Sequence, residues 1–371
     1  MVNNMKKLGF GLMRLPLMDE KSKEVNIEDF QQLVDYFMDK GYNYFDTAYT
    51  YLNGNSEKSV KEVLVKRYPR NSFYLASKLP IFNLEKEEDM ERIFNEQLDR
   101  CGVEYFDYYM LHNVSSKHID KFTKIDSFSF VNKKKSEGKI KHLGISCHDT
   151  PEFLEKILKS HPEIEFVQLQ INYLDWLDEI IDSKGNYEVA CKYNKQIIIM
   201  EGLKGGALVN LPEKATDILK NHDNTKSTVS WGFGFNLSLD NVLVILSGMN
   251  KMEDLKENIE IFENFTTLKK EDYKVLNEVC DVINENHPIK CTDCGYCLSE
   301  CPNSINIPYY FKLYNTQKLL TQEHSIGMYY RNFSSSNSSP SDCIECGKCV
   351  KMCPQKIDIP GRLKDIVKIF E

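Results

Sequence analysis

The stretch NIEDFQQLVDYFMDKGYNYFDT, residues 26–47, joins one helical pattern to one strand pattern and decides the fold. Asn26 is a favoured N-cap residue and Gly41 a favoured residue after a helix, so we predict an amphipathic helix over Ile27–Lys40. The apolar run Tyr42–Thr47 follows at once and predicts a short buried strand. Helices that alternate with strands in this way are the repeating units of α/β proteins.

The same alternation continues as far as Phe262. Apolar runs predict eight strands, at Leu8–Leu12, Tyr42–Thr47, Phe73–Lys78, Phe106–His112, Ile140–Ser146, Phe166–Ile171, Gln196–Met200 and Val242–Ser247. Helical patterns between them include Ser56–Tyr68, Glu87–Cys101, Pro151–Ser160 and Lys251–Phe262. This order favours an α/β fold of the (β/α)8 TIM barrel type. The competing doubly wound sheet would be expected to carry a Gly-x-Gly-x-x-Gly turn after an early strand, and residues Gly9–Arg14 do not complete one.

Polar side chains stand at the ends of the predicted strands, where TIM barrels carry their catalytic residues. They are Asp46, Lys78, His112, Ser146 and Gln168, with Tyr51 five residues beyond Asp46. A neighbouring lysine lowers the pKa of a tyrosine from its ordinary value near ~10, and an aspartate holds that lysine charged. Taken alone, Asp46 is explained as a helix cap, Lys78 as a solvated charge and His112 as a core residue. Together they favour a site that donates a proton to a carbonyl oxygen.

At these residues the sequence resembles the aldo-keto reductase family. The matching segments are Phe45–Tyr51, Asn55–Glu57, Ala76–Lys78, Tyr109–His112, Gly138–Ser146, Val167–Tyr173, Ser247–Met249 and Glu257–Asn258. The resemblance implies a barrel that binds NAD or NADP without a Rossmann fold. It implies that Tyr51 is the proton donor, that Lys78 and Asp46 tune it, and that His112 orients the substrate carbonyl. It also implies cofactor contacts from Ser146, Gln168, Met200, Ser247, Glu257 and Asn258.

Three positions depart from the family pattern. Cys147 stands where the family usually has an asparagine, which weakens one contact to the nicotinamide carboxamide. Met200 replaces the aromatic ring that many members stack on the nicotinamide. Asp254 stands where members that prefer NADP often have an arginine, although Lys251 and Lys256 are near it in sequence. The choice between NADP and NAD therefore stays open.

Two copies of one cysteine pattern, each followed by proline, occupy the end of the chain. The copies are Cys291-x-x-Cys294-x-x-Cys297-x-x-x-Cys301-Pro302 and Cys343-x-x-Cys346-x-x-Cys349-x-x-x-Cys353-Pro354, at a constant offset of 52 residues. This spacing is that of two-cluster ferredoxins, in which the fourth cysteine of each run ligates the other cluster. We therefore predict two [4Fe-4S] clusters, one held by Cys291, Cys294, Cys297 and Cys353, the other by Cys343, Cys346, Cys349 and Cys301.

Zinc and disulfides are the alternatives for these cysteines. Structural zinc sites usually use two separated Cys-x-x-Cys pairs and need no proline, and disulfides belong in secreted chains. The tail, including a helical pattern over Tyr309–Thr321, resembles the helical two-cluster ferredoxin module that a subgroup of aldo-keto reductases carries. We expect the barrel over residues 1–265 and the ferredoxin-like domain over residues 266–371. The other four cysteines, Cys101, Cys147, Cys191 and Cys280, are expected to be small buried side chains.

The composition excludes several classes of function. A net charge of −8 and a pI near 5.6 argue against nucleic-acid binding. No apolar stretch approaches the roughly 20 residues that cross a membrane, and no signal segment opens the chain, so we expect a cytoplasmic protein without membrane contact.

Three functions remain. The first is an NAD(P)-dependent oxidoreductase that moves hydride to or from a small-molecule carbonyl or alcohol carbon. The second is an electron-transfer enzyme whose clusters connect the barrel to ferredoxin or another redox protein, although no flavin motif is apparent. The third is a redox-sensing binding protein with structural clusters.

Overall fold

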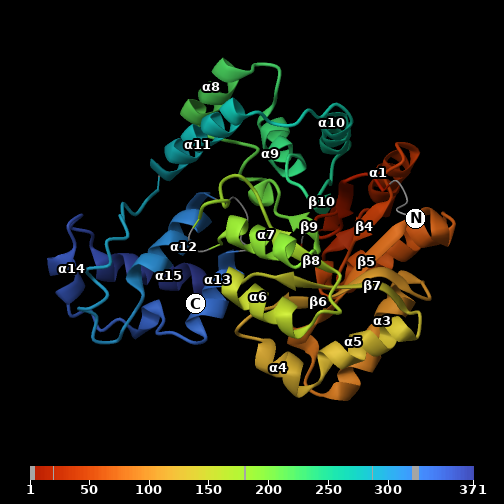
Figure 1. The fold of residues 1–371 in the computed structure, drawn as a ribbon, viewed down its shortest axis with the longest axis horizontal. Coiled ribbons are helices and arrows are strands. Elements are labelled where there is room, and N and C mark those ends of the chain that lie inside the picture. The colour runs from red at the N-terminus through yellow and green to blue at the C-terminus, as the bar shows by residue number, and fades with distance from the viewer. Residues whose placement is uncertain (1–4, 20, 179–180, 286, 320–325) are drawn as a thin grey trace. The chain divides into compact units, whose positions relative to one another are not determined.

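The computed structural model describes residues 5–19, 21–178, 181–285, 287–319 and 326–371. They form two compact units (Figure 1). The first, the barrel unit, comprises Met1–Leu177, Ile181–Gly202 and Ser230–Leu268. The second, the cysteine-rich unit, comprises Asp178–Ile180, Leu203–Val229 and Lys269–Glu371. The expected domain boundary after residue 265 stays a prediction.

Eight parallel strands close into a barrel in the order β1-β10-β9-β8-β7-β6-β5-β4, and β4 pairs with β1. The strands are β1 (Leu8–Gly11), β4 (Tyr44–Asp46), β5 (Tyr74–Pro80), β6 (Phe106–Val114), β7 (Ile140–Cys147), β8 (Phe166–Gln170), β9 (Gln196–Met200) and β10 (Val242–Ser247). The α/β barrel prediction is confirmed, and each strand lies within two residues of its predicted ends. A short antiparallel hairpin, β2 (Leu17–Asp19) with β3 (Glu24–Val25), was not predicted.

Helices follow the strands of the barrel unit. They are α1 (Ile27–Asp39), α2 (Asn55–Val60), α3 (Glu87–Cys101), α4 (Ile119–Lys124), α5 (Ser127–Ser136), α6 (Pro151–Ser160), α7 (Ser183–Lys192), α9 (Thr228–Leu237, which begins in the cysteine-rich unit) and α10 (Met252–Glu263). The Asn26 side chain caps α1 by accepting a hydrogen bond from the Asp29 amide at 3.2 Å. Gly41 follows that helix with a φ of +74°, a conformation that glycine adopts without strain. The helix predicted over Ser56–Tyr68 is α2 followed by one π-helical turn, η2 (Lys61–Val65).

The barrel interior is packed with side chains from alternate strand positions. One core cluster contains Tyr44, Ala76, Tyr108, Met110, Phe166, Ile198 and Val244. Gly144 leaves room for this packing, since a Cβ at that position would lie 2.4 Å from the Phe166 ring. Residues two apart on a strand point to the same face. The position two residues beyond each core residue therefore also faces the interior, one layer nearer the carboxyl ends of the strands.

The cysteine-rich unit is helical. Its helices are α8 (Glu213–His222), α11 (Lys270–Glu285), α12 (Ile307–Leu319), α13 (Ile326–Ser334), α14 (Lys348–Met352) and α15 (Ile359–Phe370). Helix α8 packs on α11, with His222 Nε2 2.8 Å from Asp272 Oδ1, and α12 packs on α13 and α15. The helix predicted over Tyr309–Thr321 is α12, and its predicted last two residues lie outside the described residues. Within the described part of the chain, no helix is both long and apolar enough to cross a membrane.

Candidate active site and cysteine centres

A buried ion pair forms the centre of the polar layer at the carboxyl ends of the strands. Asp46 ends β4 and Lys78 lies on β5, two residues beyond the core residues Tyr44 and Ala76. Lys78 Nζ lies 2.5 Å from Asp46 Oδ1 and donates a second hydrogen bond to the Thr47 carbonyl oxygen at 2.8 Å. Both side chains are almost completely buried, so the pair is fixed in position rather than solvated.

Tyr51 and His112 complete the predicted group of four. Tyr51 opens the short 3-10 turn η1 (Tyr51–Gly54), and Lys78 Nζ lies 4.6 Å from the centroid of its ring. His112 lies on β6, and its ring centroid is 6.2 Å from that of Tyr51 at an interplanar angle of 80°. Tyr51 and His112 are both partly exposed, as groups that meet a substrate must be. The structure therefore places all four predicted catalytic residues together.

The pKa of Tyr51 shifts in the direction opposite to the sequence-based expectation. Removal from water raises the pKa of Tyr51 above its ordinary value, and the charge of Lys78 offsets only part of that rise. The carboxylates of Asp46 and Glu201 add to the rise. Although burial also works against the charge on Lys78, attraction by Asp46 and by Tyr51 raises the pKa of that lysine, which stays protonated at neutral pH.

His112 is neutral at physiological pH. Removal from water lowers its pKa well below the ordinary value, and the positive Lys78 and the nearby His148 lower it further. His148 is itself buried, and burial lowers its pKa to about 4. A neutral imidazole near Tyr51 can donate one N–H to a substrate oxygen without competing for the proton of Tyr51.

These two histidines make the free energy of unfolding fall in mild acid. Their folded pKa values lie below the unfolded value near ~6.5, so below that pH the unfolded chain binds protons that the folded chain does not. For His148, with a folded pKa of about 4, the loss between pH 7 and pH 5 is about 2 kcal/mol. Urea unfolding of the wild type and of His148→Gln at both pH values measures this contribution. If the difference in free energy of unfolding between the wild type and His148→Gln is the same at both pH values, His148 does not make this contribution.

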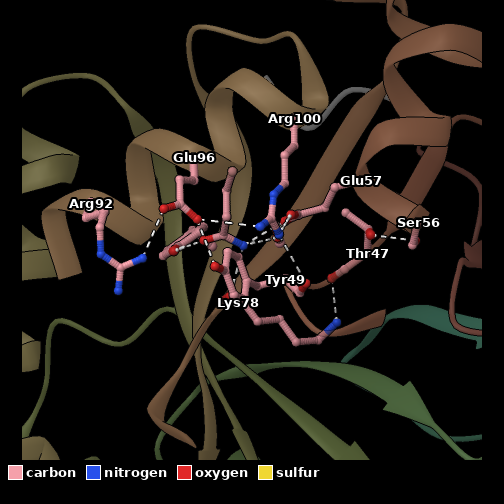
Figure 2. Close-up of polar contacts among 11 residues, drawn as sticks. Thr47, Tyr49, Ser56, Glu57, Lys78, Arg92, Glu96 and Arg100 are labelled. Carbon is pink, nitrogen blue, oxygen red and sulfur yellow. Dashed lines mark hydrogen bonds and ion pairs between the residues drawn. The ribbon is translucent and has the colours of Figure 1, made fainter. Parts of the chain in front are cut away.

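A second set of polar side chains, centred on the buried Glu57, contacts the segment of β5 that carries Lys78 (Figure 2). The Glu57 side chain is fully buried, and its Oε1 accepts hydrogen bonds from Ser77 Oγ at 3.0 Å and Gln97 Nε2 at 2.8 Å. Gln97 Nε2 also donates to the Lys78 carbonyl oxygen at 3.1 Å, and Arg100 lies 3.5 Å from Glu57 Oε2. This group fixes the strand segment that carries Lys78.

No sequence pattern predicts a role for Glu57 or for Gln97. The spacing of Glu57 could have indicated that it is buried. It lies three residues before Val60 and seven before Leu64, on the same helical face, and both of those residues are buried. A carboxylate on an apolar helical stripe indicates a buried charge that needs partners.

The residues expected to contact the cofactor fall into two groups. Ser146 and Gln168 are paired across β7 and β8, and Met200 ends β9. Gln168 Nε2 donates to Asp46 Oδ2 at 3.2 Å, and Ser146 Oγ accepts from the Asn113 amide at 2.8 Å. At the end of β10, Asn258 Nδ2 donates to Ser247 Oγ at 3.0 Å. The exposed Glu257 lies on α10 beside Asn258.

Two cavities in the cysteine-rich unit are lined by the two predicted sets of cysteines. Cys291, Cys294, Cys297 and Cys353 line one, and Cys343, Cys346, Cys349 and Cys301 line the other. About 330 Å³ of space at each is not filled by protein atoms, and part of that space is open to solvent. Four thiols around one cavity are the donor set of a [4Fe-4S] cluster, so these residues fit that group. No three His, Cys, Asp or Glu side chains in the described ranges are placed to share a single metal ion, and the fit therefore rests on the cavities.

The two cysteine runs share left-handed backbone positions, although residues 348–352 of the second run form α14 and the equivalent residues 296–300 form turns. Asp293 and Gly295 have φ values of +54° and +72°, and Glu345 and Gly347 have +56° and +69°. In each set one cysteine is buried, one is exposed and two are intermediate. The sequence repeat at an offset of 52 residues is thus repeated in these φ values and in the exposure of the cysteines. Of the remaining cysteines, Cys101 and Cys147 are buried as expected, whereas Cys191 and Cys280 are intermediate.

Comparison with known families identifies the barrel and the tail. The model of the aldo/keto reductase family matches residues 7–281. The chain belongs to the aldo/keto reductase family. A second model, of a 4Fe-4S dicluster domain, matches residues 290–357, which include all eight cysteines of the two runs. This aldo/keto reductase therefore carries an iron–sulfur domain after its barrel.

Individual relatives agree with this assignment. An aldo-keto reductase from Mycobacterium sp. (strain KMS) is 28% identical over 160 residues, 43% of this chain and 51% of the relative, so the match spans about half of that protein. The NADH-specific methylglyoxal reductase of Escherichia coli (strain K12) is 33% identical over 153 residues, 36% of this chain and 45% of the relative. The structure of an aldo-keto reductase from Klebsiella pneumoniae in complex with NADPH shares the fold, with a TM-score of 0.59, 17% identity and coverage of 74% of this chain and 91% of that one.

Proposed function

We propose that the barrel unit reduces the carbonyl group of a small molecule with NADH or NADPH. The observation that carries this proposal is the convergence of Asp46, Tyr51, Lys78 and His112 at the carboxyl ends of β4, β5 and β6. A tyrosine hydroxyl beside a buried ammonium and a neutral imidazole is suited to protonating an oxygen.

The residues of the chain then have distinct roles. The nicotinamide cofactor supplies the hydride when it is bound. The neutral His112 donates a hydrogen bond to the carbonyl oxygen and positions it near Tyr51. The Tyr51 hydroxyl donates its proton to that oxygen, and the ammonium of Lys78, held by Asp46, stabilises the phenolate that remains.

The raised pKa of Tyr51 favours reduction over alcohol oxidation. In reduction, Tyr51 gives its proton to a developing alkoxide, which is a much stronger base than a phenolate. In oxidation, Tyr51 would have to act as the base and therefore be ionised first, which a raised pKa opposes. We therefore expect the rate of alcohol oxidation at neutral pH to be limited by the small ionised fraction of Tyr51.

We assign the cofactor contacts as follows. Ser146 and Gln168 bind the carboxamide, Met200 packs on the nicotinamide ring, and Ser247, Glu257 and Asn258 lie along the adenosine end. The two relatives differ in nucleotide, since one is NADH-specific and the other is in complex with NADPH. In this chain Asp254 would repel a 2′-phosphate and Lys251 and Lys256 would attract it, so both nucleotides belong in the first assay.

The test is an anaerobic assay of the iron-replete protein with NADH or NADPH and a panel of aldehydes and ketones. Methylglyoxal is a reasonable first substrate because one relative is named for it. Oxidation of the nucleotide that depends on the carbonyl compound supports the proposal. Nucleotide binding without turnover on any carbonyl compound would contradict it.

We propose that the cysteine-rich unit holds two [4Fe-4S] clusters with crossed ligation. The last cysteine of each run, Cys301 or Cys353, lines the cavity formed by the first three cysteines of the other run. Such clusters exchange single electrons. Cys294 and Cys346 are exposed, so a cluster held by either set of cysteines would lie near the surface, which favours electron transfer as a second function.

Crossed ligation makes a prediction about single cysteine variants. We expect Cys353→Ser to disturb the cluster of Cys291, Cys294 and Cys297 and to leave the other one intact, so that about half of the bound iron is lost. Cys301→Ser should have the converse effect, and Cys101→Ser, outside both runs, should retain all the iron. Iron and sulfide analysis with EPR of the reduced proteins measures the outcome. If both variants lose both clusters, the comparison does not show which cavity each cysteine serves. In that case the EPR spectra of Cys294→Ser and Cys346→Ser identify which signal belongs to which cavity.

A further inference from the structure

The loop that carries Tyr51 has an uncommon backbone conformation. It joins β4 to α2, and the three residues after Tyr51, which are Leu52, Asn53 and Gly54, have φ values of +50°, +56° and +84°. Residues other than glycine seldom adopt left-handed φ values, and they keep them only where the surrounding structure holds the chain in place. The loop therefore needs an anchor, because the position of the proposed proton donor depends on it.

The side chain of Arg100, on α3, lies against this loop. Its guanidinium carbon lies 4.2 Å from the centroid of the Tyr49 ring, and its Nη1 lies 3.5 Å from the Tyr49 carbonyl oxygen. A Cβ at Gly54 would lie 3.0 Å from the same nitrogen, so Arg100 also borders the left-handed end of the loop. Tyr49 is two residues before Tyr51, and its hydroxyl donates to Glu96 Oε2 at 2.8 Å. The two side chains of α3 thus hold Tyr49 at its carbonyl group, its ring and its hydroxyl.

The same guanidinium joins the loop to the buried Glu57. Arg100 Nη1 lies 3.5 Å from Glu57 Oε2, and Figure 2 shows the Arg100 side chain extending from α3 toward that carboxylate. The other oxygen of Glu57 accepts a hydrogen bond from Gln97, which also donates to the Lys78 carbonyl oxygen. One buried carboxylate is therefore connected both to the segment that carries Lys78 and to the loop that carries Tyr51.

The charges around Arg100 favour this bridge over a solvated arginine. Arg100 Nη2 lies 3.5 Å from Glu96 Oε2, so the guanidinium has one carboxylate on α3 and a second one at Glu57. The hydrogen bond from Tyr49 lowers the pKa of Glu96. Burial raises the pKa of Glu57, and the charge of Arg100 is among the interactions that oppose the rise. Release of Arg100 into solvent would leave the Glu57 carboxylate buried without this cation.

We propose that Arg100 is a positioning residue for carbonyl reduction, which holds the Tyr51 hydroxyl in place by bridging the Tyr51 loop to Glu57. The inference rests on the proposed function, because Tyr51 is the proton donor of that reaction. Displacement of a reacting group by about 1 Å lowers a rate by about 10²-fold. A planar guanidinium suits the bridge, since its N–H groups reach a carbonyl oxygen and two carboxylates while its face lies on the Tyr49 ring.

The test compares substitutions of two arginines on α3 in the full, iron-replete chain. Arg100→Met removes the bridge. Arg92→Met is the matched control, because Arg92 pairs with Glu96 and Asp89 on its own helix. We expect Arg100→Met to lower kcat about 10–10²-fold and to leave the Kd of the nucleotide within about twofold of the wild type, whereas Arg92→Met keeps both within about twofold. Steady-state kinetics and fluorescence titration with the nucleotide measure these values.

Arg100→Lys shows whether the bridge or only its charge matters. Lysine keeps a positive charge beside Glu57, so this variant should be closer to the wild type in thermal stability than Arg100→Met. It cannot reach three oxygens from one plane, and we expect kcat still to fall at least about threefold. Wild-type kcat in Arg100→Lys would show that only the charge beside Glu57 is required, and it would overturn the positioning role.

A Tyr51→Phe background separates positioning from damage to the fold. Because Arg100 acts through the Tyr51 hydroxyl, adding Arg100→Met to Tyr51→Phe should change the residual turnover by less than about twofold. A further fall by the factor seen in the wild-type background overturns the proposal. A kcat of Arg100→Met equal to that of Arg92→Met overturns it as well.

Failure of the proposed function has a separate signature. Absence of carbonyl reduction by the wild type, or full turnover of Tyr51→Phe, would refute the proposed function and the role of Arg100 together. Loss of turnover in Tyr51→Phe, with equal kcat in Arg100→Met and Arg92→Met, would refute the role of Arg100 and leave the proposed function intact.

Discussion

Replacing Tyr51 with phenylalanine is expected to lower kcat for carbonyl reduction by about 10²–10⁴-fold. The variant keeps the ring that lies 4.6 Å from Lys78 Nζ and removes only the hydroxyl that donates the proton. The binding of NADH or NADPH should change little, because the cofactor contacts are assigned to residues of β7, β8, β9, β10 and α10. Steady-state kinetics with the best substrate and fluorescence titration with the nucleotide separate these two effects.

Two measurements show whether the loss of kcat comes from the missing Tyr51 hydroxyl rather than from damage to the fold. Tyr187→Phe removes a tyrosine hydroxyl that donates to the Asp240 carbonyl oxygen at 3.1 Å, on a helix of the barrel unit, and it should retain wild-type turnover. The thermal stability of Tyr51→Phe should be close to that of the wild type, since Tyr51 is partly exposed. Full turnover of Tyr51→Phe on a substrate that the wild type reduces would remove the assignment.

Most of the fold was predictable because its signals are local. The caps and periodicity around α1, and the short apolar runs of the eight strands, depend on neighbouring residues alone. The interruption of the second helix by a π-helical turn at Lys61–Val65 was not predictable in this way, because nothing in local propensity distinguishes it from an α-helix.

The catalytic group was predictable from strand ends, whereas its electrostatics were not. Strand ends place Asp46, Lys78 and His112 in one layer whatever the details of packing. The sign of the pKa shift of Tyr51 depends instead on how burial compares with the charge of Lys78, which only the folded surroundings determine. The support of Lys78 by Glu57 and Gln97 likewise requires three segments to meet.

Replacing Lys78 with methionine is expected to lower the free energy of unfolding at pH 7 by about 3–5 kcal/mol and to abolish reduction. Methionine leaves the Asp46 carboxylate buried without the ammonium that lies 2.5 Å from it. The pKa of Asp46, which burial already raises, should then rise further. A carboxyl whose folded pKa exceeds its unfolded value binds more protons in the folded state, so the deficit of the variant relative to the wild type should grow as pH rises through that range.

The double variant Asp46→Asn/Lys78→Met separates charge from packing. Because it removes both charges, it should recover much of the lost stability while remaining inactive, since Tyr51 still lacks its cationic neighbour. Lys134→Met is the matched control, because this lysine is 6% exposed but its partners Glu91 and Glu137 are accessible to water, and the expected loss is about 1 kcal/mol or less. Urea unfolding at several pH values measures all four proteins. If Lys78→Met loses no more stability than Lys134→Met, then Asp46 is not a buried carboxylate that depends on Lys78. The proposal that the Asp46–Lys78 pair stabilises the Tyr51 phenolate would then be wrong as well.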